Sequence, residues 1–388
     1  MKLKKLFFVI VFLLIGTSLR AQEAQNIADL DFLYNSILKL PSYKDQLKND
    51  KTYQQLYENM RKDLKSIDEF EIYLKLLQLI YPIKDNHLGL WRKPDSSFRF
   101  KYLKERVDEK EVMSKYEMYP VDNLEGIYIR PGNVNRYVLF RKMKNVYYLQ
   151  NFKTGIVELI LNQSGSQTFD AIRFMGPPVP YVLYRNVKLT NGKLTGLNFQ
   201  KLLPQTYAPI KFTEAKYEYK VLEQEIGYLR LSTFSSSNDN IKVATDFFTK
   251  VRSTINTRYL IVDLRNNGGG GDKTSGQFYT FLKKYEGEIF ILQNSNTVSN
   301  AEQFILNIKS SKKITTLGEL TRGTITYGSN YGKTIELPGK RFLFYPTDMN
   351  GRSKDLAYES IGIQPDISLD AFGEDWIAQT IKYIKSKK

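Results

Sequence analysis

Apolar residues recur at helical spacing over residues 26–80, near the start of the chain. Most stand three or four positions apart, with polar residues between them; they are Leu30, Leu33, Ile37, Leu38, Phe70, Leu74, Leu77 and Ile80. This spacing predicts amphipathic helices. Pro41 and Pro82 interrupt the pattern, and Pro82 is expected to end the last helix shortly before His87. His87 is therefore predicted to lie in a loop or at the start of a strand.

Between residues 123 and 205 the pattern changes to short runs in which apolar and polar residues alternate. Runs over residues 126–129, 137–140 and 146–150 are separated by turn residues, which predicts antiparallel strands. The pair Asn191-Gly192 is typical of a two-residue hairpin turn. We expect an antiparallel meander or a small barrel, and we recognise no glycine-rich carboxylate-binding loop of a PDZ module in it.

From residue 226 onward, apolar strands alternate with amphipathic helices. The strands are predicted at residues 228–233, 259–264 and 289–293, and the helices at 241–253, 273–285 and 301–309. Such a βαβ series builds a largely parallel sheet, which binds ligands beyond the carboxyl ends of its strands. The fold class is therefore α/β. We expect a helical unit over residues 22–100 that carries the His87 loop, a β-rich insert over 101–215 and an α/β core over 216–388.

Residues 1–21 have the pattern of a secretory signal peptide. Lys2, Lys4 and Lys5 precede an apolar run over residues 6–15, and a small-residue stretch ends at Ala21. No later segment offers about 20 apolar residues in a row, so we expect no transmembrane segment. The sequence predicts an exported protein, periplasmic or extracellular.

Composition narrows the chemistry that is open to the chain. It contains no cysteine and a single histidine, and its formal net charge is +16. The absence of cysteine excludes disulfides and thiol nucleophiles, and one histidine makes a zinc site improbable. The lysines are scattered and form no dense run, so nucleic acid is not an expected partner.

A glycine run, Gly268 to Gly271, follows the apolar strand that ends near Asp263 and precedes a helix. Backbone amides at such a helix N-terminus suit an anion. A phosphate loop would need a Lys-Ser/Thr ending, which is missing here. An oxyanion hole and an ordinary flexible turn both stay open as interpretations.

Three side chains elsewhere in the sequence could carry chemistry. Ser299 and Glu302 form an S-x-x-E pattern at a helix start, which indicates a capping box and also fits a nucleophile beside helix amides. His87 is the histidine that any serine–histidine mechanism in this chain must use. Glu359 is either an exposed strand residue or the carboxylate that such a histidine needs.

Six motifs follow one another in an order that resembles one family of serine peptidases. They are Asp85-Asn86-His87, Gly227 to Leu231, Asp263 to Gly270, Ser299-Asn300-Ala301-Glu302, Gly318 to Gly323, and Glu359 to Asp366. In this order they resemble the C-terminal-processing (tail-specific) and tricorn-type peptidases. The likeness covers the core and the His87 loop, and it does not cover the β-rich insert.

The resemblance implies a crotonase-like (ClpP/crotonase) core and hydrolysis of peptide bonds through an acyl-enzyme. Ser299 would be the nucleophile and His87 the general base. The amides of Gly268 or Gly269, together with that of Asn300, would bind the oxyanion. The substrates would be peptides or unfolded proteins, and neither a metal nor an organic cofactor is expected.

Two further positions decide which branch of the family the chain resembles. Glu359 would orient His87 through Asn86, at the place where the tricorn-type branch has a serine. Thr324 stands where the tail-specific branch has its lysine base, so that Ser–Lys dyad is absent and Lys333 is a nearby alternative. The resemblance is therefore to the tricorn-type branch.

Two other classes of function stay open. One is a catalytically inactive protein that binds a peptide or an apolar ligand on the same core. The other is an envelope glycan hydrolase, which would need two facing carboxylates that the sequence does not single out.

Overall fold

The computed structural model describes residues 21–64, 68–99, 101–105, 108–116, 119–176, 178–208, 215–330 and 333–387. They fall into two compact units. Unit 1 comprises the described residues up to Tyr102, with Asp170–Arg185 and Tyr327–Gly351, and unit 2 comprises Leu103–Phe169, Asn186–Thr326 and Arg352–Lys388. The predicted signal peptide lies outside the described residues except for Ala21. Within the described ranges, no helix is long and apolar enough to cross a membrane.

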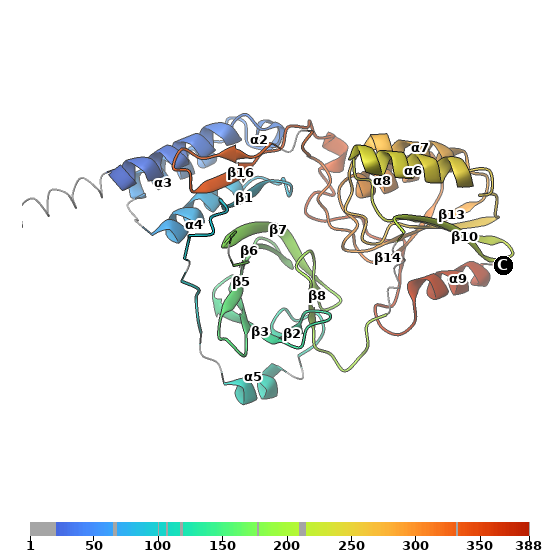
Figure 1. Ribbon diagram of the computed structural model, residues 1–388, viewed down its shortest axis with the longest axis horizontal. Coiled ribbons are helices and arrows are strands. Elements are labelled where there is room, and N and C mark those ends of the chain that lie inside the picture. The colour runs from blue at the N-terminus through green and yellow to red at the C-terminus, as the bar shows by residue number, and fades with distance from the viewer. Residues whose placement is uncertain are drawn as a thin grey trace, which may run out of the picture. The chain divides into compact units, whose positions relative to one another are not determined.

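Unit 1 begins with the helices that the apolar spacing predicts. A helix over residues 21–37 is followed by α2 (Pro41–Gln46), α3 (Lys51–Asp63) and α4 (Glu69–Ile80) (Figure 1). Asp50 and Asp68 cap α3 and α4 by accepting hydrogen bonds from amides of the first turn. Pro82 follows the end of α4 as predicted. Pro41 begins a helix instead of only interrupting one, because proline fits the first helical turn.

Unit 1 also contains short strands in the order β15-β16-β1-β7-β6. They are β15 (Ile335–Glu336), β16 (Phe342–Tyr345), β1 (Gly89–Arg92), residues 181–185 of β7 (Tyr181–Thr190) and residues 170–174 of β6 (Thr168–Phe174). β1 runs antiparallel to β16, with Gly89 opposite Tyr345 and Arg92 opposite Phe342. This pairing fixes the start of the strand that follows the His87 loop.

The β-rich insert consists of antiparallel strands. Besides β6 and β7 they are β2 (Gly126–Ile129), β3 (Arg136–Met143), β4 (Val146–Asn151), β5 (Val157–Gln163), β8 (Lys193–Leu194) and β9 (Phe199–Lys201), and α5 (Glu109–Tyr116) precedes them. The order β7-β6-β5-β4-β3-β2-β9-β8, with an additional β7–β8 pairing, is that of a closed eight-stranded barrel (Figure 1). Asn191 and Gly192 form the β7–β8 turn at φ values of 48° and 74°, which confirms the predicted hairpin.

The core of unit 2 is a six-stranded sheet in the order β10-β11-β12-β13-β14-β17. The strands are β10 (Tyr217–Glu223), β11 (Ile226–Leu231), β12 (Tyr259–Asp263), β13 (Glu288–Gln293), β14 (Thr315–Gly318) and β17 (Ile367–Ser368). β10 is antiparallel to β11, and the other neighbours are parallel. The predicted α/β class is confirmed, with one antiparallel strand, β10, at the edge of the sheet.

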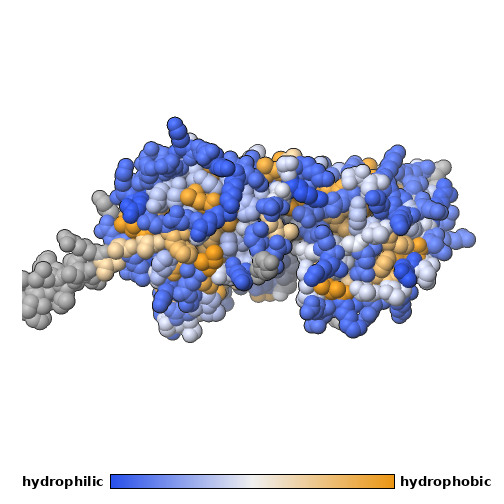
Figure 2. Space-filling view, turned by 90° about the horizontal axis from the view of Figure 1, so that it is seen from above, coloured by the Kyte–Doolittle hydropathy of each residue, from blue (hydrophilic) through white to orange (hydrophobic). Residues whose placement is uncertain are grey.

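Helices cover both faces of this sheet. Leu260 and Val262 of β12 belong to the cluster that packs under α6 (Asn238–Val251), α7 (Asp272–Lys284) and α8 (Asn300–Ser311). Ile261 points to the opposite face, where α9 (Trp376–Ser386) contributes Trp376. The short helix η1 (Ser353–Asp355) precedes the last strand. In Figure 2 the visible surface is mostly hydrophilic, with small apolar patches between.

Candidate active site

Two loops meet beyond the carboxyl ends of neighbouring parallel strands in unit 2. One follows β12 and contains the glycine run, and the other follows β13 and ends at Ser299, the residue before α8. They are in contact, because the amide of Val298 donates a hydrogen bond to the carbonyl of Asn267 at 2.9 Å. The fold thus brings Ser299 to the glycine run, at the edge of the sheet where ligands bind.

Ser299 has an unusual backbone conformation, with φ 58° and ψ −120°. A residue other than glycine rarely adopts a positive φ, and such a conformation costs on the order of 1–3 kcal/mol. It persists only where the surroundings hold it. Serine nucleophiles between a strand and a helix can be held in such a strained conformation. Ser299 is the last of the six residues between β13 and α8.

Glu302 holds this turn from the first turn of α8. Its carboxylate is completely buried and accepts hydrogen bonds from the amides of Ser299 (2.9 Å), Gly323 (2.7 Å) and Thr324 (3.1 Å), and from the hydroxyl of Thr321 (2.6 Å). The predicted capping box is present. Burial raises the pKa of Glu302 above its ordinary value, and these donors oppose the rise. Glu302 therefore fixes the start of α8 and a second loop at once.

Gly269 lies directly against Ser299. Its φ is +85°, and an added Cβ would stand 2.7 Å from the carbonyl oxygen of Val298 and 2.9 Å from Cβ of Ser299, so this approach requires glycine. The amide of Gly269 donates to Oδ1 of Asn267 at 2.9 Å. Among the residues that the structure describes, none accepts a hydrogen bond from the Gly268 amide, which leaves that amide available to an anion.

Asn300 opens α8, so its amide belongs to the positive end of the helix dipole. Its side chain donates to Oδ1 of Asp272, the first residue of α7, at 2.9 Å. A cavity of about 240 Å³ lies between α7 and α8 and is lined by both residues and by Tyr279 and Phe304. The residue that follows Ser299 thus lines a cavity, and its amide lies at the positive end of a helix dipole.

Glu359 is a buried carboxylate in a third loop of unit 2, with 3% of the residue exposed. Its Oε2 accepts hydrogen bonds from the amides of Ile325 and Thr326, both at 2.9 Å. The next residue, Ser360, donates its amide to the carbonyl of Gly323 at 2.8 Å. The interpretation of Glu359 as an exposed strand residue is wrong, because these contacts place it in a turn inside unit 2.

Asn86 and His87 belong to unit 1, where they form the turn between α4 and β1. The predicted loop at His87 is confirmed. Asp85 is completely buried and accepts a hydrogen bond from the His87 amide at 3.2 Å. The buried guanidinium of Arg185 donates to the carbonyls of Ile83 (2.9 Å) and Asp85 (3.4 Å). Two buried charged groups therefore hold the backbone that carries His87.

The charged residues at the start of the glycine motif have a structural role. Asp263 is completely buried and accepts hydrogen bonds from Nε (2.9 Å) and Nη2 (2.7 Å) of Arg265, from Arg230 (3.1 Å) and from the hydroxyl of Tyr228 (2.8 Å). Burial alone would raise the pKa of Asp263, but the two arginines outweigh it and the pKa lies below its ordinary value. This cluster anchors the glycine loop at the end of β12.

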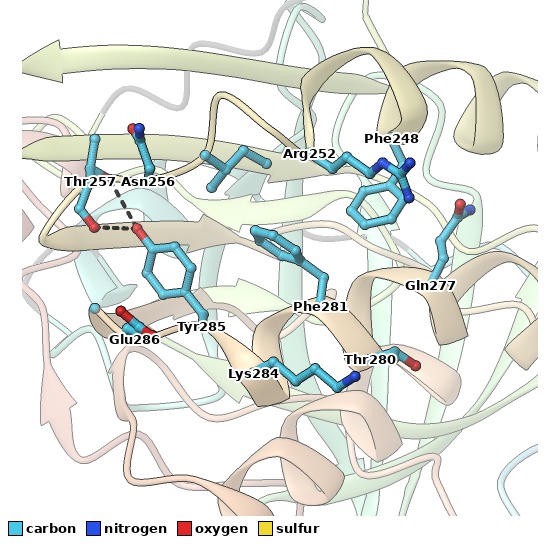
Figure 3. Close-up of a pocket in the computed structure, with 12 residues that line it drawn as sticks. Phe248, Arg252, Asn256, Thr257, Gln277, Thr280, Phe281, Lys284, Tyr285 and Glu286 are labelled. Atoms are coloured by element: carbon cyan, nitrogen blue, oxygen red, sulfur yellow. Dashed lines mark hydrogen bonds between the residues drawn. The ribbon is translucent and has the colours of Figure 1, made fainter.

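A second cavity of about 500 Å³ lies elsewhere in unit 2, between the C-terminal parts of α6 and α7 (Figure 3). Phe248, Arg252 and Phe281 line it, and the hydroxyls of Thr257 and Tyr285 are 3.1 Å apart at one end. It contains none of the predicted site residues. Over the described ranges, no group of three or more His, Asp or Glu side chains could hold a metal ion.

One protein-family model matches part of the chain. The model of peptidase family S41 matches residues 225–278 and 271–369, which confirms the resemblance. No curated protein sequence matches the chain.

Several solved structures are distantly similar to this chain. A lipoprotein from Streptococcus agalactiae shares 12% identity at a TM-score of 0.43, covering 94% of this chain and 97% of its own. The photosystem II D1 C-terminal processing protease shares 14% identity at a TM-score of 0.39, covering 89% and 93%. The tricorn protease shares 12% identity at a TM-score of 0.41, covering 94% of this chain and 37% of its own.

Proposed function

Residues 225–369 carry the sequence pattern of peptidase family S41, and from this premise we propose that the protein is a serine-type peptidase with Ser299 as its nucleophile. The observation that carries the proposal is the backbone of Ser299, held at φ 58° beside Gly269 and at the N-terminus of α8. A serine that only capped a helix would not need this strained conformation.

The reaction proceeds through an acyl-enzyme. Oγ of Ser299 attacks the peptide carbonyl while His87 accepts its proton, and the carbonyl oxygen becomes an oxyanion. The amides of Gly268 and Asn300 stabilise that charge, because the amide of Gly269 is already bonded to Asn267. His87 then protonates the leaving amine, and water, activated in the same way, hydrolyses the ester.

The remaining assignments rest on the sequence. His87 is the base because it is the chain's one histidine and Thr324 replaces the lysine of the tail-specific branch. Glu359 orients His87 through Asn86. The α/β core is crotonase-like, the substrates are peptides or unfolded proteins, and the signal-peptide pattern supports export to the periplasm or the cell exterior.

A serine-directed fluorophosphonate tests the proposal. We expect it to modify Ser299 of the intact protein. We expect Ser299→Gly and His87→Ala to reduce both this labelling and the rate of hydrolysis of unfolded protein substrates by several orders of magnitude. Ser299→Gly is the preferred inactive variant because glycine adopts a positive φ without strain.

Ser310→Ala, on the exposed side of the same helix, is the matched control and should label and cleave normally. Normal turnover by folded Ser299→Gly would refute the peptidase assignment. A folded wild-type protein that neither labels nor cleaves would favour the inactive ligand-binding protein.

A further inference from the structure

A buried lysine from the barrel reaches the loops around the candidate active site. Lys188 lies on β7, within the part of that strand that belongs to unit 2, and only 6% of the residue is exposed. Its ammonium group donates hydrogen bonds to the carbonyl of Arg322, at 2.9 Å, and to the carbonyl of Ile361. Lysine is almost never buried without a compensating partner, so this position calls for an explanation.

The two carbonyls belong to the two loops that surround the buried carboxylates of the site. Arg322 stands among the residues that hydrogen-bond to Glu302, and Ile361 follows Glu359 by two positions. The loops also bond directly, because the amide of Ile363 donates to the hydroxyl of Thr321 at 2.7 Å. Lys188 therefore joins both loops at one point.

Charged groups of both signs lie around Lys188. Burial lowers its pKa from the ordinary 10.5 to about 8; the carboxylates of Glu302 and Glu359 act to raise it again, and the guanidinium of Arg322 acts to lower it. Two buried carboxylates and the half-buried guanidinium of Arg322 thus act on the buried ammonium. Removing one partner from such a group leaves an uncompensated charge inside the protein.

We propose that Lys188 is a positioning residue of the peptidase site: its ammonium clamps the two loops around Glu302 and Glu359, and through Glu302 it holds Ser299 in the conformation for attack. The inference rests on the proposed function. It gives the β-rich insert a part in the reaction, because the barrel supplies a positive charge at a site where Thr324 replaces the family's lysine.

The contacts of Lys188 with the two loops should become weaker as the pH rises. Lys188 is charged below its pKa and neutral above it, so the clamp weakens as the pH rises through about 8. The groups that face it are Glu302, Glu359 and Arg322. The rate of acylation of Ser299 should therefore fall on the alkaline side, in a range where a histidine base alone would leave the rate level.

The chain offers a matched control in Lys201. This lysine is also buried in the barrel (3% exposed), its pKa is also lowered to about 8 by burial, and its ammonium also donates to two backbone carbonyls, those of Pro120 (2.8 Å) and Glu125 (3.0 Å). It has none of the loop contacts of Lys188. Changes that depend only on burying a lysine in the barrel should appear at both positions.

The experiment measures the rate of fluorophosphonate labelling of Ser299, and kcat and KM for peptide hydrolysis, from about pH 6 to about pH 10. We expect wild type, Lys201→Arg and Lys201→Met to lose rate above about pH 8. Lys188→Arg should keep its rate to the end of the range, because arginine stays charged. Lys188→Met should lose about ten- to a hundredfold in labelling rate and kcat at neutral pH, with KM nearly unchanged.

The proposal is overturned if Lys188→Arg keeps the alkaline fall, if Lys188→Met behaves as wild type, or if the Lys201 variants change the profile in the same way. A wild-type protein that does not label at any pH contradicts the proposed function instead. In that case amide hydrogen exchange decides: faster exchange at residues 323–326 in Lys188→Met, and not in Lys201→Met, supports the clamp, and equal exchange rejects it.

Discussion

The backbone amide of Ser299 donates a hydrogen bond to the carboxylate of Glu302, 2.9 Å from Oε2. The same carboxylate binds three donors of the loop that contains Thr321, Gly323 and Thr324. One buried acid thus holds the strained serine and the neighbouring loop together. A motif that reads as a capping box is also the support of the candidate nucleophile.

Glu302→Gln tests this support. The variant keeps the shape of the side chain but replaces an acceptor oxygen by an NH₂ group, which faces donors and leaves them unpaired. We expect a loss of about 2–4 kcal/mol in the free energy of unfolding, and a loss of Ser299 labelling. Urea denaturation measures the first effect. Exposed Glu286→Gln should stay within about 0.5 kcal/mol of wild type, and an equally small effect at Glu302 would contradict the proposed support.

Gly269→Ala tests the close approach of the glycine loop to Ser299. Its methyl group would stand 2.7 Å from the carbonyl oxygen of Val298, at a φ of +85°. We expect a loss of about 1–3 kcal/mol in stability and at least tenfold slower labelling. An alanine Cβ at Gly268 meets no atom within 4 Å, so Gly268→Ala should stay within about 0.5 kcal/mol of wild type. Equal effects of the two substitutions would show that the loop does not constrain Ser299.

The Asp263 cluster predicts a specific acid sensitivity. The pKa of Asp263 is lowered in the folded protein, so its ion pairs stabilise the fold fully above the unfolded pKa of about 4 and lose that contribution as the pH falls further. Asp263→Asn leaves the buried Arg265 unpaired and should cost about 3–5 kcal/mol at pH 7. The difference in the free energy of unfolding between the variant and wild type, measured by urea denaturation, should become smaller as the pH falls from about 4 to about 2. Asp246→Asn, at an exposed position, serves as the control. If the difference in the free energy of unfolding between Asp263→Asn and wild type did not depend on pH, the proposed role of the Asp263 ion pairs would be rejected.

Much of the core could be predicted because its signals are local. The helices predicted at residues 241–253, 273–285 and 301–309 correspond to α6, α7 and α8 with shifts of at most three residues at either end. The alternation of apolar and polar residues predicted β2 and β4, and the pair Asn191-Gly192 predicted the turn between β7 and β8. The order of the motifs along the chain also indicated the resemblance to peptidase family S41, which the family model matches over residues 225–369.

Other features depend on contacts between distant parts of the chain. The pairing of β1 with β16 joins residues 89–92 to residues 342–345, and no local sequence pattern predicts this pairing. Arg185 and Lys188 read as ordinary polar positions of a strand, yet both are buried because their donors meet backbone carbonyls of other segments. The positive φ of Ser299 is likewise imposed by its neighbours. The sequence indicated Ser299 and its capping box with Glu302, but not the close approach of Gly269 to Ser299.

Strand β7 has a consequence for how this chain could have been assembled. Its residues up to Arg185 belong to one compact unit and its residues from Asn186 to the other, with no linker between them. Near its end, Lys188 satisfies carbonyls of Arg322 and Ile361 in the core. Recombination that exchanged the barrel for another insert would remove Lys188, and also Asn186, which donates to the same Arg322 carbonyl at 2.7 Å. The barrel and the loops around Glu302 and Glu359 are therefore expected to be inherited together.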